Sequence, residues 1–174
     1  HLDKLEALSV YIMREAFAVS GFARMAGDDM SVLDALLLVF DLLRTDYRCD
    51  YVYRNAITNK VYLGRHSPAT TTLLSELRVW RSKADLAMFN GTSIAYEIKT
   101  ELDNLDRLAS QLDDYSSVFD RIFVVTSEAQ VGVVLERVPD HVGVLALTPN
   151  LSLATARDAS ANVDHVLTES IVDA

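Results

Sequence analysis

The spacing of hydrophobic residues changes along the chain from helical to strand-like and then alternates between the two. Apolar residues recur every three or four positions over residues 3–25 and again over residues 31–45. This spacing predicts two amphipathic helices. The sequence AGDD at residues 26–29 is typical of a turn and separates them.

A third helical segment and a short fourth one are predicted before the strands begin. Tyr53, Ile57 and Val61 recur at helical spacing, and Gly64 lies where we expect this helix to end. The polar stretch RHSPATTT follows, and its Ser and Thr residues favour the cap of a short helix that runs to about Glu76.

The central part of the chain has the alternating pattern of β-strands. RVW, ADLAMF and SIAYEIK, at residues 78–80, 84–89 and 93–99, are three short strand candidates. The dipeptide Asn90-Gly91 between the last two is a strong hairpin signal. We therefore expect these two strands to be antiparallel neighbours.

Helices and strands alternate after residue 100. Asp103 is the expected N-cap of a helix whose apolar stripe contains Leu105, Leu108, Leu112, Tyr115 and Phe119. Next come a buried strand at residues 121–126, a helix at 127–137, and a strand at 142–148. This order predicts an α/β sandwich around a mixed sheet, in which an antiparallel meander leads into a crossover.

The length of 174 residues favours a single domain. We expect an N-terminal helical segment over residues 1–50, a core over 51–150, and a C-terminal helical extension over 151–174. The final sequence VDHVLTESIVDA has no cap signal, and the chain begins with His rather than Met, so we expect a fragment.

Composition narrows the range of functions. The longest apolar run, ALLLVF, is too short to span a bilayer, and no signal peptide is visible, so we expect a cytoplasmic protein without membrane contact. Cys49 is the only cysteine, which excludes an internal disulfide. The net charge of −9 argues against nucleic acid, but residues 44–83 contain eight basic and three acidic residues. Such a segment could face phosphates, or its basic side chains could point in different directions.

The candidate chemistry lies on the predicted hairpin. Strand alternation and the tight turn allow Asp85 to face Glu97 on the neighbouring strand, with Lys99 on the same face. Two carboxylates this close repel each other unless a cation lies between them. Carboxylate oxygens at an open site suit Mg²⁺ or Mn²⁺, and Lys99 could neutralise charge on a phosphate. Glu76 could add a further carboxylate. The alternative is a structural ion pair on a sheet face.

These residues resemble the signature of the PD-(D/E)XK nuclease superfamily. The resemblance rests on Asp85 followed by Glu97-Ile98-Lys99, and on Gln111 and Tyr115, which are similar to a Gln-x-x-x-Tyr element of one of its subgroups. The run from YVYRNAITNKVYLGRH onward is similar to a poorly characterised bacterial family with this core. Lys83-Ala84 stands where the name of the superfamily has proline.

The resemblance implies a restriction-endonuclease-like fold and a site role for each of these residues. Asp85, Glu97 and the Ile98 carbonyl would bind the metal, with Glu76 as a further ligand. Lys99 would be the catalytic lysine, while Gln111 and Tyr115 would support the site or the nucleic-acid strand. Separately, the positions of Arg78, Arg81 and Lys83 beside the site make them candidate phosphate contacts, although a solvated hairpin explains them equally well.

We therefore expect a metal-dependent nuclease that hydrolyses phosphodiester bonds in DNA, with RNA left open as a substrate. One alternative is a non-catalytic nucleic-acid-binding or protein-interaction module on the same fold. Another is a nuclease toxin or defence effector that a partner protein inhibits. A homodimer also stays open.

Overall fold

The computed structural model describes residues 30–162, so the helix expected over residues 3–25 and the helical end expected over 163–174 lie outside the described residues. The chain divides into two compact units, His1–Tyr47 and Arg48–Ala174. In the first unit, helix α2 (Val32–Asp46) confirms the helix predicted over residues 31–45. Its N-cap is Ser31, whose Oγ accepts a hydrogen bond from the Asp34 amide at 3.1 Å. Within residues 30–162, no helix is long and apolar enough to cross a membrane.

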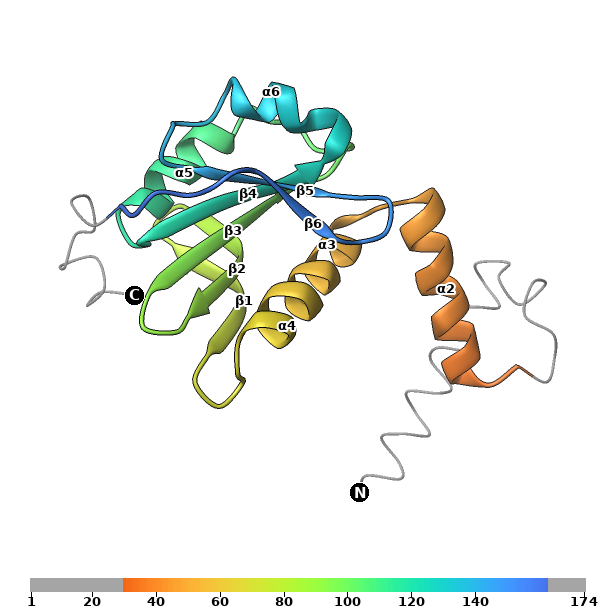
Figure 1. Ribbon diagram of the computed structural model, residues 1–174. Coiled ribbons are helices and arrows are strands. Elements are labelled where there is room, and N and C mark those ends of the chain that lie inside the picture. The colour runs from red at the N-terminus through yellow and green to blue at the C-terminus, as the bar shows by residue number, and fades with distance from the viewer. Residues whose placement is uncertain (1–29, 163–174) are drawn as a thin grey trace. The chain divides into compact units, whose positions relative to one another are not determined.

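The second unit is built on one mixed sheet of six strands in the order β1-β2-β3-β4-β5-β6 (Figure 1). The strands are β1 (Thr72–Val79), β2 (Ser82–Phe89), β3 (Ser93–Lys99), β4 (Arg121–Ser127), β5 (Gly143–Leu147) and β6 (Leu153–Arg157). The first three form an antiparallel meander, β3, β4 and β5 are parallel, and β6 returns antiparallel to β5. The predicted α/β class and mixed sheet are therefore confirmed.

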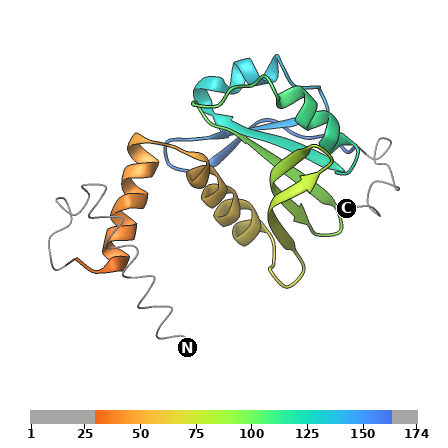
Figure 2. The same ribbon diagram turned by 180° about the vertical axis from the view of Figure 1, so that it is seen from behind.

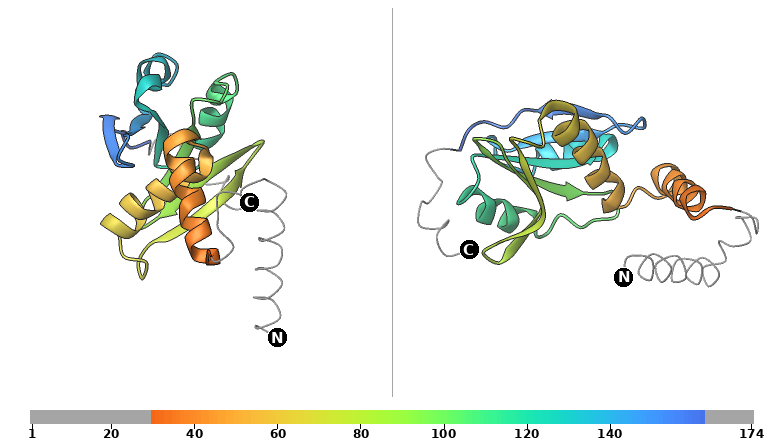
Figure 3. Two further views of the ribbon diagram at one scale, coloured as in Figure 1. Left: turned by 90° about the vertical axis from the view of Figure 1, so that its right-hand side faces the viewer. Right: turned by 90° about the horizontal axis from the view of Figure 1, so that it is seen from below.

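Helices flank the sheet of the second unit on both faces (Figures 2 and 3). On one face lies a continuous helical segment made of α3 (Asp50–Ile57), the π-helical turn η2 (Thr58–Tyr62) and α4 (Leu63–Arg65). On the other lie α5 (Leu108–Ser116), the 3₁₀ turn η3 (Glu128–Gln130) and α6 (Val131–Leu135). The core beneath α5 and α6 includes Leu112, Tyr115, Phe119, Val124, Val134 and Val144. The site described below lies at one end of this core.

The short helix expected to run to Glu76 is wrong, because β1 already begins at Thr72 and includes Glu76. Leu and Glu are good helix formers, so the local sequence favours a helix over part of this segment. Backbone pairing with β2 along most of its length overrides that preference. Of the strand predicted at residues 78–80, the first two residues are the end of this longer strand, and Trp80 lies in the turn that follows.

Two further expectations from the second half of the chain are corrected. Asp103 does not cap a helix, because α5 begins at Leu108; its carboxylate instead accepts hydrogen bonds from the amide and hydroxyl of Thr100. The helical extension expected over 151–174 is wrong at residues 153–157, which form β6. The strand β6 exists because the outer edge of β5 offers backbone partners, and such a partner cannot be read from the local sequence.

Candidate active site

The site forms where β2 and β3 separate. Pairing between these strands runs from Phe89–Ser93 to Leu86–Tyr96 and then stops, whereas β2 stays paired with β1 to the end of their hairpin. At the point of separation, Oδ2 of Asp85 accepts a hydrogen bond of 2.8 Å from the Ile98 amide. The carboxylate of Asp85 therefore accepts a hydrogen bond that a backbone carbonyl accepts in a regular strand pair. Beyond this point β2 and β3 diverge, and we call the opening between them the fork.

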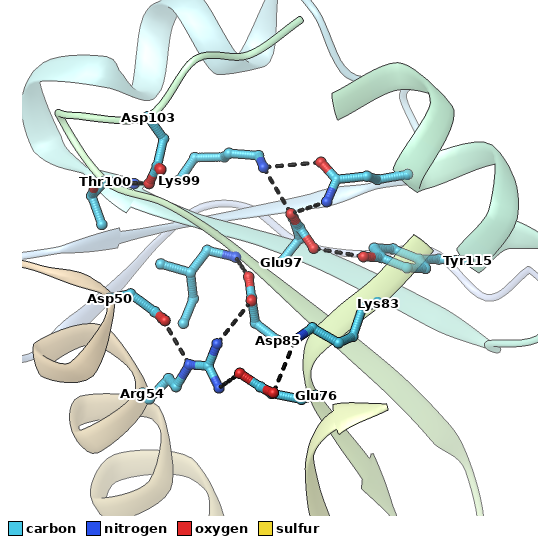
Figure 4. Close-up of polar contacts among 12 residues, drawn as sticks. Asp50, Arg54, Glu76, Lys83, Asp85, Glu97, Lys99, Thr100, Asp103 and Tyr115 are labelled. Carbon is cyan, nitrogen blue, oxygen red and sulfur yellow. Dashed lines mark hydrogen bonds and ion pairs between the residues drawn. The ribbon is translucent and has the colours of Figure 1, made fainter. Parts of the chain in front are cut away.

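Glu97 lies on the other arm of the fork and is buried, with 2% of its surface exposed. Its Oε1 accepts hydrogen bonds from Nζ of Lys99 at 2.8 Å and from Nε2 of Gln111 at 2.6 Å. Its Oε2 accepts one from the Tyr115 hydroxyl at 2.7 Å. Nζ of Lys99 also donates to Oε1 of Gln111 at 2.9 Å (Figure 4). Helix α5 thus holds both charged side chains of β3 in one fixed arrangement.

Three site residues predicted from the sequence meet Glu97 in this network: Lys99, Gln111 and Tyr115. Gln111 lies at the edge of the apolar stripe of α5, where a polar group needs a partner, and Glu97 and Lys99 provide it. Burial and the charge of Glu97 raise the pKa of Tyr115 above its ordinary value, so its hydroxyl remains a hydrogen-bond donor.

The carboxyl group of Asp85 has a strongly altered acidity. Burial and the neighbouring charge of Glu97 raise its pKa to about 7, although the Ile98 amide and Arg54 favour the charged form. Glu97 is therefore close enough to Asp85 for the two charges to repel each other. Two largely buried carboxylates placed this way favour the uptake of a proton or a cation.

Arg54 on α3 is a site residue that the sequence did not reveal. Its Nη2 lies 3.1 Å from Oδ1 of Asp85, its Nε lies 2.8 Å from Oδ1 of Asp50, and its Nη1 lies 3.5 Å from Oε1 of Glu76. Burial alone would lower the pKa of Arg54, but the hydrogen bond and charge of Asp50 and the other two carboxylates raise it. The only sequence signal is the four-residue spacing of Asp50 and Arg54 on one helix, which does not point to Asp85.

Glu76 lies at the edge of this cluster. Its side chain is half exposed and contacts Lys83 at 2.9 Å as well as Arg54. The hydrogen bond and charge of Lys83 hold its pKa below the ordinary value. Its φ of 58° is unusual for a residue within a strand and directs this part of β1 away from regular pairing. The structure therefore brings Glu76 to Arg54 and Lys83, and not into the network around Glu97.

A cavity of about 410 Å³ opens between the arms of the fork. Asp85, Glu97, Ile98, Lys99 and Gln111 line it, and Glu76 does not. Basic side chains from three segments add to its wall: Arg78, Arg81, Lys83 and Arg107. The three candidate phosphate contacts from the sequence are all part of this set, and Arg107 is a fourth that was missed. Asp50 and Asp103 also line the cavity, so the two carboxylates face a wall that carries both basic and acidic side chains.

The donor set fits a hard divalent cation. Among the described residues no group of three or more His, Cys, Asp or Glu side chains is arranged to hold a metal. Mg²⁺ does not require one, because it keeps several waters and is often held by one or two carboxylates together with substrate oxygens. Asp85 and Glu97 supply that pair, and a cation would offset both the burial and the charge of Glu97 that raise the pKa of Asp85.

Comparison with known proteins places most of the chain in one family. Residues 43–170 match the family described as bacteriophage P4 protein cII. Protein cII of Enterobacteria phage P4 is 37% identical over 83 residues, which are 47% of this chain and 31% of that protein. The matched part thus spans about a third of the length of this curated relative. A solved structure, the SPO1766 protein of unknown function from Silicibacter pomeroyi, is 16% identical with a TM-score of 0.44, covering 59% of this chain and 67% of that one.

Proposed function

The chain belongs to the bacteriophage P4 protein cII family, and we propose that its second unit is a metal-dependent nuclease. The observation that carries this proposal is that Asp85 and Glu97 line one cavity at the fork, together with Lys99 and several arginines. Stability alone does not explain this cluster. Removing charged side chains from water costs free energy, and hydrophobic residues of similar volume at the same positions often give an equally stable or more stable fold.

Each residue has a distinct role in this proposal. Asp85, Glu97 and the Ile98 carbonyl hold Mg²⁺ or Mn²⁺, which when bound polarises a phosphodiester and lowers the pKa of a water. Lys99 places a positive charge where negative charge develops on the phosphate. Gln111 and Tyr115 hold Glu97 and Lys99 at fixed positions through α5. The basic residues at the cavity wall bind phosphates of the strand, with DNA as the favoured substrate.

The same arrangement supports a restriction-endonuclease-like core of the PD-(D/E)XK type. Asp85 and the Glu97-Ile98-Lys99 sequence lie on antiparallel neighbours, and the Gln111–Tyr115 helix follows and covers their face. The parallel strand β4 comes next along the chain. The resemblance to the PD-(D/E)XK signature thus extends from the spacing of these residues in the sequence to their positions on the strands and the helix.

One observation favours a non-catalytic module as a second candidate. Asp85 and Glu97 each already contact a protein cation, Arg54 and Lys99 respectively. An ion-pair network of this kind could hold the fork closed without any metal. The two candidates differ in whether a divalent cation displaces the contact between Arg54 and Asp85.

Cleavage assays with matched variants test the nuclease. Plasmid and linear DNA, and an RNA of similar length, are incubated with Mg²⁺ or Mn²⁺ and with EDTA. We expect metal-dependent cleavage that falls at least 100-fold in Asp85→Asn and Lys99→Met, in line with the loss of an electrostatic contributor to catalysis. The exposed acid Glu128 lies outside the cavity, so Glu128→Gln serves as the control and should cleave normally.

Calorimetric titration with Mn²⁺ separates the two candidates. The nuclease requires Mn²⁺ binding that Asp85→Asn abolishes and Glu128→Gln leaves intact. Absence of any cleavage that depends on Asp85, together with absence of Mn²⁺ binding, would refute the nuclease and leave the ion-pair module.

A further inference from the structure

Trp80 lies at the tip of the β1–β2 hairpin and is the only tryptophan of the chain. It is 56% exposed and has a φ of 51°. A positive φ is unfavourable for a bulky side chain, and glycine or asparagine is the usual choice at such a position. A tryptophan that is more than half exposed at a position where a smaller residue is usual suggests a role beyond packing.

The indole ring is held in place. Its Nε1 donates a hydrogen bond of 2.9 Å to Oγ of Ser117 at the end of α5, and Oγ of Ser117 donates to the Asp114 carbonyl at 2.7 Å. The bond uses the edge of the ring, while more than half of the residue stays exposed. A second cavity, of about 580 Å³, lies here, and Trp80, Arg81, Asp113, Asp114 and Ser117 line it.

This second cavity adjoins the candidate active site. Arg81 lines both cavities, and Ser82 of the first donates a hydrogen bond of 2.6 Å to Asp114 of the second. Arg78, Arg81 and Arg107 form no ion pair with another described residue. Guanidinium groups without an ion-pair partner therefore line the cavity that holds Asp85 and Glu97, and that of Arg81 also lines the cavity beside the indole.

We infer that Trp80 is a stacking platform for an unpaired base, and that the substrate is a nucleic-acid strand with unpaired bases next to the scissile phosphate. The inference rests on the proposed function, since it places the base relative to the same site. Bases in a duplex stack on one another, so a ring at the side of the strand can stack only on a base that is unpaired or flipped out. The arginines supply the phosphate contacts that a strand entering the cavity needs.

The acidic residues of the second cavity fit the same ligand. Asp113 and Asp114 would repel a phosphate beside the indole, but their carboxylates can accept hydrogen bonds from N–H groups on base edges, including N3–H of thymine. A base at Trp80 and phosphates near Arg78, Arg81 and Arg107 therefore match the distribution of charge. An acidic peptide would match the arginines but not these aspartates.

Intrinsic fluorescence tests the inference directly, because all tryptophan emission comes from Trp80. The full chain in EDTA is titrated with a 12-nucleotide oligo-dT and with a blunt 12-base-pair DNA duplex that has no unpaired base. We expect the single strand to quench the emission and to bind about tenfold more tightly than the duplex. Trp80→Leu should weaken single-strand binding about tenfold in fluorescence anisotropy of labelled oligo-dT, and Trp80→Phe should retain most of it.

Two controls separate stacking from a structural role. Tyr47→Leu removes another exposed aromatic, outside the second unit, and should leave binding unchanged. Thermal unfolding shows whether Trp80→Leu is folded; if it is not, quenching in the unmodified chain still decides. Binding without quenching, equal affinity for the duplex, or normal binding by folded Trp80→Leu would overturn the inference. Quenching without cleavage dependent on Asp85 would instead refute the nuclease and retain the stacking site.

Discussion

At the scale of single residues, the behaviour of the site depends on the carboxyl group of Asp85. Its pKa is about 7 in the folded chain, against an ordinary value of 3.8. Between these two values the folded state holds a proton that the unfolded state has released, so protonation stabilises the fold in this range. The free energy of unfolding should therefore fall as the pH rises from about 4 to about 7.

This linkage gives a measurable pH dependence. In EDTA, the free energy of unfolding should fall by about 1–3 kcal/mol between pH 5 and pH 8, since one pKa unit corresponds to about 1.4 kcal/mol. Asp85→Asn should lose most of this dependence, while Glu128→Gln should keep it. Urea unfolding at several pH values provides the measurement, and an unchanged profile in Asp85→Asn would contradict the assignment.

Two buried tyrosines form a natural pair for testing the network around Glu97. The hydroxyl of Tyr115 donates to Glu97, whereas that of Tyr53 is buried without a hydrogen-bond partner among the described residues. Tyr115→Phe should cost about 1–3 kcal/mol, because it removes a bond to a buried carboxylate. Tyr53→Phe should be neutral or slightly stabilising. Equal losses in denaturant unfolding would show that the hydrogen bond to Glu97 contributes nothing specific.

A site residue could be predicted from the sequence where its partners lie on neighbouring segments of the chain. Asp85, Glu97 and Lys99 lie on two strands joined by a short turn, so alternation alone brings them together. Gln111 interrupts an apolar stripe, and a polar group there needs a partner. Arg54 and Trp80 give no such signal, because the first reaches Asp85 from a helix 31 residues earlier and the second is distinguished only by its backbone and exposure.

At the scale of elements, the errors of the sequence interpretation lie where pairing between distant segments decides the structure. Residues 72–76 and 153–157 form strands because β2 and β5 offer backbone partners to them. The buried strand β4 and the helix α5 were predictable, since their own apolar patterns identify them. Edge strands have weaker patterns because one or both of their faces are exposed, as the burial of β1 and β6 shows.

The contact between β4 and β5 can be tested with two glycines. Gly143 pairs with Phe123, and a Cβ at Gly143 would collide with the Phe123 ring and lie 2.8 Å from the Ala159 amide nitrogen. Gly143→Ala should therefore destabilise the fold by about 1–3 kcal/mol. In α6 a Cβ at Gly132 meets nothing within 4 Å, so Gly132→Ala should be neutral or stabilise by up to about 1 kcal/mol. Chemical denaturation of both variants provides the comparison, and a neutral Gly143→Ala would mean that Phe123 moves freely.

At the scale of the whole molecule, the contacts of the candidate site all lie within one compact unit. Every hydrogen bond and ion pair described for the site, from Arg54 on α3 to Tyr115 on α5, falls inside the unit Arg48–Ala174. The chain carries a net charge of −9, yet the cavity of this unit is bordered by Arg78, Arg81, Lys83 and Arg107. Local placement of charge, rather than the total, decides whether an anionic strand can approach.

A fragment of residues 48–174 should therefore fold cooperatively and retain the site. We expect its free energy of unfolding to lie within about 1 kcal/mol of that of the full chain, because none of the contacts described for the site network involves residues 30–47. Single-strand binding and any cleavage dependent on Asp85 should also be retained, and urea unfolding and the oligo-dT titration measure both.

A shorter fragment provides the contrast. Residues 48–152 lack β6 and Asn162, whose buried side chain donates to the carbonyl oxygens of Ser116 and Phe119 at the end of α5. Without them the edge of β5 is unpaired and two carbonyl groups lose their partner, so this fragment should unfold at lower urea or fail to fold. If the fragment 48–174 also failed to fold, the full chain and this fragment would differ only in residues 1–47. These residues would then be part of the cooperative folding unit.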